Sequence, residues 1–430
     1  MTSAQIVSLE KSKIFFSKNV SKDLEKLIND ESGIKSTRDL GKYLGMPILQ
    51  KRINKDTFGE VLERVSSRLA GWKSHCLSFA GRLTLTKSFL SSIPIHTMSS
   101  VILPQSTLEG LDKRARMFLW GSSSDKKRIH LVAWDKVCLP KREGGLGIRT
   151  SKVMNKALVS KVGWRLMNDK QSLWAKILRS KYRVGELQDR SWMNKKRPRS
   201  STWRSVTAGL RDVVVRGSRW VIGNGCDARF WVDSWLSHVP LLNKTVADVP
   251  EAERELRVKD LWIDGLGWRL DRILPFVSYF TRLELVAVVL DSVTGARDRL
   301  SWGYSANGAF TVKSAYELLT ENQVSRPDLS ACYDRVWRVV APERVKTFLW
   351  MVAQQVIMTN VKRVRRHIGD MSVCQVCKNG EETILHVLRD CPSIAGIWRR
   401  LVPVQRRHDF FTDKLFGWIY GNLGFVMGGV

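Results

Sequence analysis

The sequence predicts an α+β fold that is mostly helical and carries a small zinc-stapled unit near its C-terminus. Three observations lead to this fold class. Apolar residues recur at helical spacing over long stretches, and the runs with strand-like alternation are short. In addition, four side chains of metal-binding type fall between residues 374 and 391.

The N-terminal segment is expected to be mixed. The stretch LEKSKIFFS alternates like a strand around Ile14 and Phe16. The stretch KYLGMPI predicts a second strand that ends at Pro47, because proline cannot donate a hydrogen bond to a neighbouring strand.

Amphipathic helices are predicted for the central part of the chain. Over residues 108–120 one helix face is apolar and the other is basic. The apolar residues are Leu108, Leu111, Ala115, Phe118 and Leu119, and the basic residues are Lys113, Arg114 and Arg116. A further helical stretch at residues 156–178 is broken near Asn168 and Asp169.

The second half of the chain is predicted to begin with a linker and a mixed region. The basic, proline-bearing KKRPRSS at residues 195–201 is typical of an exposed linker. Residues 203–298 are rich in tryptophan and contain strand-like pieces such as VVVRGSRWVIGNG. Beyond them we expect a short strand at residues 309–312 and helices at residues 314–319 and 345–356.

Four potential metal ligands follow the last of these helices, with the spacing C-x2-C-x8-H-x4-C. They are Cys374, Cys377, His386 and Cys391. Three thiolates and one imidazole complete a tetrahedral shell with no open position, which is typical of structural rather than catalytic zinc. The alternative is a set of ordinary buried cysteines beside an unrelated histidine.

The remaining cysteines, Cys76, Cys138, Cys226 and Cys332, lie singly along the chain. This is not a disulfide framework, and no apolar leader precedes the chain, so we expect a reducing compartment, the nucleus or the cytoplasm. No uncharged apolar run reaches membrane-spanning length, so no membrane partner is expected.

The charge predicts a polyanionic partner. Seventy-one Lys and Arg against 41 Asp and Glu give a formal net charge of +30. Neutralised phosphates release counterions, so RNA or DNA is the first candidate, ahead of an anionic membrane or a charge without function. Two basic surfaces are predicted to bind it, unless they are merely solvated helix faces: Lys113, Arg114 and Arg116 in one, and Lys362, Arg363, Arg365, Arg366, Arg399 and Arg400 in the other.

The sequence contains none of several enzyme signatures. It has no phosphate-binding loop, no G-x-S-x-G and no H-E-x-x-H. It also has no two adjacent aspartates, which could hold the paired cations of phosphoryl transfer. Asp227 and Asp233 are close in sequence but are expected to be solvated or capping residues.

Several ordered segments resemble a known family. LEKSKIFFS, KYLGMPI, GWKSHCLSFAGRLTLTKSFLSSIP, FLWGSS and HLVAWDKVCLPKREGGLGI resemble the C-terminal part of plant LINE-type (non-LTR) retrotransposon reverse transcriptases. VWRVVAPERVKTFLWMV with the four-ligand pattern resembles the zinc-binding domain of that family. The resemblance covers nearly the whole chain.

The resemblance implies a division of the chain into five parts. They are a remnant of the polymerase palm and primer grip (1–53), a helical thumb-like region with its extension (54–190), a linker and tryptophan-rich mixed region (191–299), the reverse-transcriptase zinc-binding domain (300–405) and a truncated tail (406–430). Relatives often continue into a ribonuclease H domain.

The family's aromatic-x-Asp-Asp motif, which binds the catalytic metals, has no counterpart here. We therefore expect no catalytic residues, and a zinc-binding, nucleic-acid-binding C-terminal fragment that is inactive as a polymerase in isolation. The resemblance also suggests association with other retrotransposon proteins. Two alternatives remain open: a zinc-stapled module for protein–protein contact, and a decayed reading frame without selected function.

Overall fold

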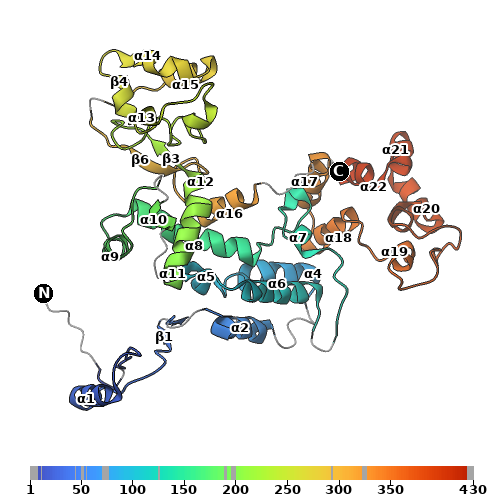
Figure 1. The fold of residues 1–430 in the computed structure, drawn as a ribbon. Helices are drawn as coiled ribbons and strands as arrows, with labels where there is room; N and C mark the ends of the chain where they lie inside the picture. Colours follow the sequence, from blue (N-terminus) through green and yellow to red (C-terminus); the bar gives the residue numbers. More distant parts are fainter. Residues whose placement is uncertain are drawn as a thin grey trace.

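The structure is a computed structural model in which helices dominate (Figure 1). It describes residues 8–10, 12–43, 45–49, 53–54, 56–69, 77–123, 126–187, 191–194, 200–291, 294–321 and 327–423. Among these residues the strands are short and pair only two at a time. The predicted α+β class with mostly helical content is confirmed.

The N-terminal segment contains a helix that the sequence analysis did not predict. Helix α1 (Lys22–Ser32) begins after Ser21, whose hydroxyl accepts a hydrogen bond from the Leu24 N–H. It ends at Gly33, which adopts the left-handed backbone that glycine tolerates best. Both ends are therefore specified by local side-chain chemistry.

Of the two strands predicted for this segment, the first is wrong and the second is confirmed only in part. The stretch around Ile14 forms only an isolated bridge to Ser36, because no longer strand lies beside it. The predicted strand at residues 42–48 is instead a tight antiparallel hairpin of β1 (Lys42–Tyr43) and β2 (Met46–Pro47). The chain reverses at Gly45, where φ is 81°.

A helical body follows, and α8 lies at its centre. Its helices are α2 (Gly59–Leu69), α4 (Phe79–Leu85), α5 (Ile95–Ser100), α6 (Gln105–Trp120), α7 (Trp134–Val137), α8 (Ser151–Asn168), α9 (Leu173–Tyr182), α10 (Ser191–Asn194) and α11 (Ser201–Gly209). Helices α5, α6 and α11 pack against α8, as does the later α16 (Val312–Thr320). A π-helical turn, η2 (Thr86–Leu90), follows α4.

A buried asparagine on α8 fixes this packing. The Asn155 side chain is fully buried and accepts a hydrogen bond from the Leu103 N–H at 2.8 Å. It also donates to the carbonyls of Met98 and Val101 at 2.7 and 2.9 Å. All three backbone groups lie at or just after the end of α5. One side chain therefore provides hydrogen-bond partners for buried backbone groups that would otherwise have none.

The predicted helices of the body are confirmed. The helix expected at residues 108–120 is α6, and four of its five predicted apolar positions are buried: Leu108, Leu111, Phe118 and Leu119. The predicted break near Asp169 separates α8 from α9. There the Asp169 carboxylate accepts a hydrogen bond from the Ser172 N–H.

Residues 222–298 form an insertion module whose base is closed by two strands. β3 (Ser218–Val221) pairs antiparallel with β6 (Arg299–Trp302). Between them lie α13 (Glu251–Arg254), the hairpin of β4 (Trp262–Ile263) and β5 (Gly267–Trp268), α14 (Leu270–Ile273) and α15 (Tyr279–Val286). The module projects from the helical body (Figure 1) and has its own core, which includes Phe230, Trp231, Trp235, Leu261, Ile273 and Leu285.

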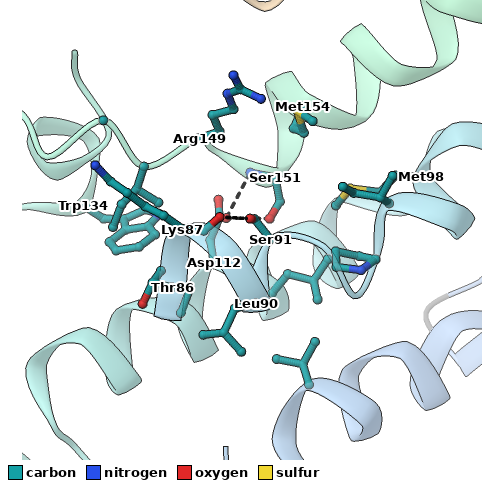
Figure 2. A pocket seen from close by; sticks show the side chains of 17 residues that line it. Thr86, Lys87, Leu90, Ser91, Met98, Asp112, Trp134, Arg149, Ser151 and Met154 are labelled. Atoms are coloured by element: carbon teal, nitrogen blue, oxygen red, sulfur yellow. Dashed lines mark hydrogen bonds between the residues drawn. The ribbon is translucent and has the colours of Figure 1, made fainter. Parts of the chain in front are cut away.

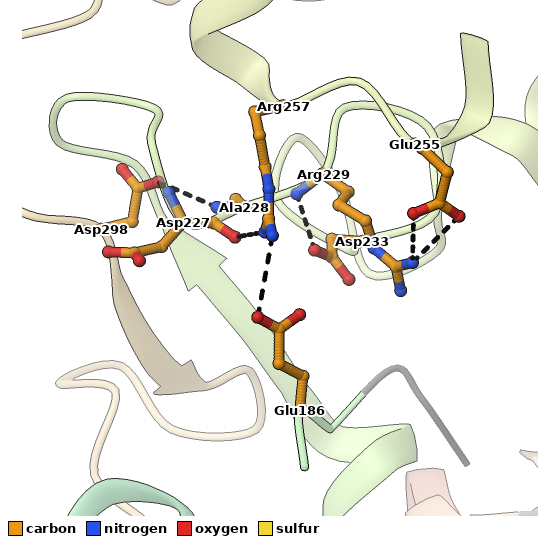
Figure 3. A network of polar contacts seen from close by, with 8 residues as sticks. All are labelled: Glu186, Asp227, Ala228, Arg229, Asp233, Glu255, Arg257 and Asp298. Atoms are coloured by element: carbon orange, nitrogen blue, oxygen red, sulfur yellow. Dashed lines mark hydrogen bonds and ion pairs between the residues drawn. The ribbon is translucent and has the colours of Figure 1, made fainter. Parts of the chain in front are cut away.

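One buried carboxylate closes the base of the insertion module (Figure 3). Asp298 Oδ1 accepts hydrogen bonds from the N–H groups of Gly223 and Gly225, at 2.8 and 2.9 Å. Its Oδ2 accepts from the N–H groups of Asp227 and Ala228, at 2.8 and 3.0 Å. Four backbone donors that would be costly to bury alone therefore converge on one anion.

Asp233 caps a turn in the same module, as predicted. Its Oδ2 accepts a hydrogen bond from the Arg229 N–H at 2.8 Å. Beside it, the Arg257 guanidinium donates to the Asp227 carbonyl and lies 3.7 Å from the Glu186 carboxylate (Figure 3). These acidic residues serve the structure of the module.

The strands predicted around the insertion module are partly wrong. The start of VVVRGSRWVIGNG is helical, as η4 (Leu210–Val214) and α12 (Val215–Gly217), and only the later part forms β3. Residues 309–312 form no strand. Thr311 instead caps α16 by accepting a hydrogen bond from the Ser314 N–H, and the strand in this region is β6.

The C-terminal unit consists of α17 (Pro327–Arg338), α18 (Glu343–Ala353), α19 (Asn360–Arg365), α20 (Pro392–Leu401), α21 (Arg407–Thr412) and α22 (Leu415–Leu423). It packs onto the helical body at Gly144. The Trp350 indole N–H and the Gln354 amide both donate to the Gly144 carbonyl, at 2.9 and 2.6 Å. A side chain at Gly144, where φ is 85°, would meet the Tyr333 ring at 2.8 Å.

The helices predicted at residues 314–319 and 345–356 are α16 and α18. The five domain limits remain predictions, but two contacts cross the limit expected at residue 299: β6 pairs with β3, and α16 packs against α8. Residues 195–199 of the predicted linker lie outside the described residues. No helix in the described ranges combines the length and the apolar character needed to cross a bilayer.

We predict that Asp298→Ala destabilises the insertion module by about 3 kcal/mol, because four buried N–H groups lose their acceptor. Urea unfolding followed by tryptophan fluorescence measures this change, since the module is rich in tryptophan. Asp248→Ala, at an exposed position of the same module, is the matched control and should leave the midpoint unchanged. Equal midpoints for Asp298→Ala and the wild type would contradict the role of this carboxylate.

Candidate metal centre

Four side chains meet in the C-terminal unit: Cys374, Cys377, His386 and Cys391. Their ligand atoms all lie within 4.8 Å of one another. Cys377 Sγ is 3.3 Å from His386 Nε2. The structure thus brings together all four residues that the sequence pattern selects.

The first two thiols come from a tight turn. The Cys374 N–H donates to the Gly380 carbonyl at 2.9 Å, and the Lys378 N–H donates to the Cys374 carbonyl at 2.9 Å. Lys378 adopts a left-handed backbone with φ of 55°, which closes the turn. The Asn379 N–H then points to Cys377 Sγ at 3.5 Å, where it would stabilise a thiolate.

The imidazole and the third thiol come from a π-helical turn, η8 (His386–Asp390). The Cys391 N–H donates to the His386 carbonyl five residues earlier, at 2.8 Å. This extra residue in the turn brings positions 386 and 391 to the same side. Helix α20 starts directly after Cys391, with Pro392 at its first position, where no N–H is needed.

The chemistry of the four groups fits zinc. Cys374 and Cys391 are each 3% exposed, and the set contains no carboxylate. The Asn379 N–H lowers the pKa of Cys377, but burial and the Cys374 and Cys391 thiols raise it above the usual value. The hydrogen bond with Ser393 lowers the pKa of Cys391.

Thiolates this close repel one another unless a cation lies between them. A zinc ion held by three thiolates and one imidazole removes that repulsion and leaves no open position for a substrate. The predicted cofactor, zinc, is therefore supported by the geometry, and its role here is structural.

A buried arginine joins the zinc turn to the last two helices. Arg389, which lies in η8, is 4% exposed. Its guanidinium donates to the carbonyls of Phe410 and Asp413, at 3.0 and 2.7 Å. It also pairs with Asp390 at 2.6 Å. These contacts tie the segment that leads into α22 to the turn that the zinc ligands close, while α22 itself also packs on α17.

A second set of hydrogen bonds joins the zinc turn to α19. The Glu382 carboxylate accepts from the Asn360 backbone N–H at 2.9 Å and from its side-chain amide at 3.0 Å. The same amide donates to the Val373 carbonyl, beside the first ligand, and the Glu382 N–H donates to the Ser372 carbonyl. The first turn of α19 is therefore fixed to both sides of the zinc turn.

The basic residues predicted beside the zinc turn differ in exposure. Arg363 and Arg365 on α19 are exposed, and within the described residues neither forms an ion pair with a carboxylate. Lys362 is half-buried. Arg366 is also half-buried and donates to the Leu131 carbonyl of the helical body at 3.3 Å.

Two more of the predicted cations lie on α20. Arg399 and Arg400 are both exposed, in the last turn of the helix. The Arg399 guanidinium also lies over the Phe411 ring, 5.8 Å from its centroid. This contact keeps Arg399 close to α21 without burying its charge.

The other predicted basic surface does not form one exposed face. Lys113 is exposed, but Arg114 faces α2, where its Nε donates to the Ser66 hydroxyl at 2.7 Å. Arg116 is half-buried on another side of α6, next to His130. Burial first, and then this arginine, lowers the pKa of His130. The packing of α2 on α6 explains the difference from the sequence-based expectation.

Sequence reasoning missed three residues that support the site: Asn360, Glu382 and Arg389. Asn360 and Glu382 bond to each other, and Arg389 bonds to backbone carbonyls up to 24 residues away, and no spacing rule identifies such pairs. Asn360 is the first residue of α19, after the N-cap Thr359, so no capping preference singled it out.

Comparisons with known proteins agree with this geometry. Residues 310–398, which include all four ligands, match the family described as "zinc-binding in reverse transcriptase". A "Putative ribonuclease H protein" of Arabidopsis thaliana is 57% identical over 379 residues, which are 88% of this chain and 61% of that protein. An "Uncharacterized mitochondrial protein" of Arabidopsis thaliana is 33% identical over 146 residues, which are 34% of this chain and 93% of that protein. The chain thus spans less than two thirds of the first relative.

We predict that the purified chain contains about one zinc ion and that a strong chelator unfolds the C-terminal unit first. Cys377→Ser should lose its zinc on dialysis against a weak chelator, because only three ligands remain. Cys226→Ser is the control, since Cys226 is an exposed free thiol in the insertion module. Elemental analysis that finds no zinc in the wild type, after anaerobic preparation, would contradict the site.

Proposed function

The chain is a reverse-transcriptase-related protein, and from that premise we propose that its zinc unit binds RNA or DNA through exposed arginines. The proposal extends to origin: the chain corresponds to the C-terminal part of a LINE-type, non-LTR retrotransposon reverse transcriptase of a plant. We further propose a nuclear or cytoplasmic location, which is compatible with the free cysteines of the described residues.

One observation carries the proposal of nucleic-acid binding. Arg363 and Arg365 extend from a helix whose first turn is hydrogen-bonded to the zinc turn through Asn360 and Glu382. The backbone that presents these cations is therefore already ordered. Binding of phosphate would therefore cost little conformational entropy at this helix, and the affinity would be higher than for a disordered basic segment.

The distribution of charge supports the same proposal. The insertion module, residues 222–298, carries 12 Asp and Glu against 9 Lys and Arg, a net charge of −3. The rest of the chain carries 62 Lys and Arg against 29 Asp and Glu, a net charge of +33. Electrostatic attraction of phosphates therefore favours the helical body and the zinc unit over the insertion module.

A second candidate function is protein–protein contact through the zinc unit. Ile397 and Leu401, one turn apart on α20, are 54% and 66% exposed, and Val404 beyond them is 67% exposed. An apolar stripe of this kind suits a partner such as another retrotransposon protein. Its binding would depend weakly on salt, whereas nucleic-acid binding should fall steeply with salt.

We predict that Arg363→Glu with Arg365→Glu weakens binding of single-stranded and structured RNA alike, because phosphate contacts are independent of sequence. The slope of log K against log salt concentration should become less negative by about two phosphate contacts. Fluorescence anisotropy at several salt concentrations measures both effects. Arg366 is left unchanged because its guanidinium donates a hydrogen bond to the Leu131 carbonyl of the helical body.

The matched control reverses two exposed cations of the insertion module, Lys259→Glu with Arg269→Glu. It changes the net charge by the same amount but should leave the affinity and the salt slope near those of the wild type. Zinc content should be equal in all three proteins. If both double variants weaken binding equally, the attraction comes from net charge alone and the proposed surface is wrong.

We also propose that the chain alone does not polymerise nucleotides. Among the described residues, the group placed to hold a metal consists of thiols and an imidazole, and the sequence has no adjacent aspartates. Two-metal phosphoryl transfer needs clustered carboxylates. We expect no primer extension on RNA or DNA templates with magnesium or manganese. Template-dependent extension that survives a second purification step would contradict this.

A further inference from the structure

A cavity lies in the helical body between η2, α6 and the start of α8 (Figure 2). Its volume is about 370 Å³, and it opens to solvent. That volume is at the small end of the range for ligand sites, roughly 300–1,000 Å³. It admits one small heterocycle with its sugar but neither a base pair nor a duplex.

We propose that this cavity binds a single unpaired nucleotide whose base carries an exocyclic amino group. The inference rests on the proposed nucleic-acid-binding function and extends it, because it assigns one base of a bound strand to a defined site. Three features carry it: apolar walls with one aromatic ring, two cations on one side, and a half-buried carboxylate.

The walls provide a surface for a base. Leu90, Met98, Leu111 and Met154 supply apolar atoms, and Trp134 supplies a flat aromatic face. Enzymes that take a base out of the stack hold it in such pockets, between apolar or aromatic side chains. Stacking on an aromatic ring stabilises bound single-stranded nucleic acid in other proteins.

Two cations lie on one side of the cavity. Figure 2 shows Lys87 and Arg149 together on one side, and Leu90 and Met98 away from them. In the described part of the chain neither cation forms an ion pair, although Arg149 lies over the Tyr316 ring at 5.7 Å. Two cations beside an apolar cavity suit the phosphate of a nucleotide whose base lies inside.

The charge of Lys87 is sensitive to its surroundings. Burial, and then the nearby Lys141, lower its pKa to about 8, although Glu343 of α18 acts in the opposite direction. An incoming phosphate would favour the charged ammonium and offset part of this effect. Among the described residues no carboxylate lies close enough to form an ion pair with Lys87.

The carboxylate of Asp112 would select bases that carry an exocyclic amino group. Its Oδ1 accepts hydrogen bonds from the Ser151 N–H at 3.0 Å and from the Ser151 hydroxyl at 2.7 Å, which fixes its orientation. A carboxylate in the cavity wall accepts an N–H donor from a ligand. Adenine, cytosine and guanine carry an exocyclic amino donor, and uracil and thymine do not.

The cavity is also connected to the zinc unit. Arg366 of α19 donates to the Leu131 carbonyl, three residues before Trp134 in the cavity wall. Glu343, which influences Lys87, lies at the start of α18 in the C-terminal unit. The segment that lines the cavity is therefore also the one that contacts the helix with the proposed phosphate-binding arginines.

The test is calorimetric titration of the full chain with 5′-AMP and with 5′-UMP at pH 7. We expect saturable binding of 5′-AMP that is about tenfold tighter than that of 5′-UMP, because adenine has an exocyclic amino group to donate to Asp112. Uracil has only the N3–H, and the two carbonyl oxygens that flank it would repel the carboxylate. Lys87→Met should weaken 5′-AMP binding about tenfold, since a charge-assisted contact is lost. This variant should fold, because burial already disfavours the ammonium. Equal affinities for 5′-AMP and 5′-UMP, or no binding of either, would overturn the proposal.

Two further variants separate the cavity from general charge effects. Ala115→Phe fills the cavity from α6 and should abolish 5′-AMP binding, with folding checked by circular dichroism. Lys152→Met removes an exposed charge one residue from Ser151, outside the cavity wall, and should change nothing. Loss of 5′-AMP binding in Lys152→Met, or its retention in Ala115→Phe, would contradict the site.

The pH dependence gives an independent readout. The charged form of Lys87 is lost as the pH rises through about 8, so 5′-AMP affinity should fall between pH 7 and pH 9. Lys87→Met should abolish this fall, whereas Lys141, Glu343, Arg149 and Asp112 remain in both proteins. A fall of equal size in Lys87→Met would show that Lys87 does not contact the phosphate.

Failure of this inference can be told apart from failure of the proposed function. RNA binding without 5′-AMP binding would overturn the cavity alone. Binding of 5′-AMP without RNA binding would overturn the assignment of this nucleotide to a strand and the proposed function as well. The Arg363→Glu, Arg365→Glu variant should bind 5′-AMP like the wild type, because neither arginine lines the cavity.

Discussion

The repulsion among three thiolates within a few ångströms is the constraint on which the C-terminal unit depends. Cys374, Cys377 and Cys391 can all be ionised only with a cation among them, so the zinc turn closes around the metal. Segments that are hydrogen-bonded to that turn are ordered together with it. Glu382 fixes the first turn of α19, and Arg389 fixes α21 and α22. The ion thereby adds to the apolar packing through which α22 contacts α17 and α18.

The second constraint is the separation of charge along the chain. The insertion module has a net charge of −3 and the rest has +33, although both belong to one polypeptide. The module is joined to the helical body at the β3–β6 pair and by the Arg257–Glu186 ion pair, and it has a separate core rich in tryptophan. Its buried acidic residues, such as Asp298, bind its own backbone. The basic surfaces remain on the helical body and on the zinc unit, where the cavity and α19 also lie.

The sequence predicted the zinc ligands and the longest helices because their signals are local. The four ligands fall within 18 residues, and the apolar positions of α6 repeat every three or four residues. Sequence reasoning missed the contacts whose two partners lie far apart along the chain. Asp298 binds N–H groups 70 or more residues earlier, and the β3–β6 pair joins similarly distant segments. It also overestimated the basic face of α6, because the packing of α2 that engages Arg114 has no signature in the sequence.

The central claim is that zinc orders the helix that binds phosphates. The most direct test is the salt dependence of RNA affinity, measured for the zinc-loaded chain, for the chain stripped of zinc and after zinc is restored. We expect removal of zinc to weaken binding and to flatten the slope of log K against log salt by about two phosphate contacts, and restoration to recover both. An unchanged affinity and slope in the zinc-free chain would contradict the claim.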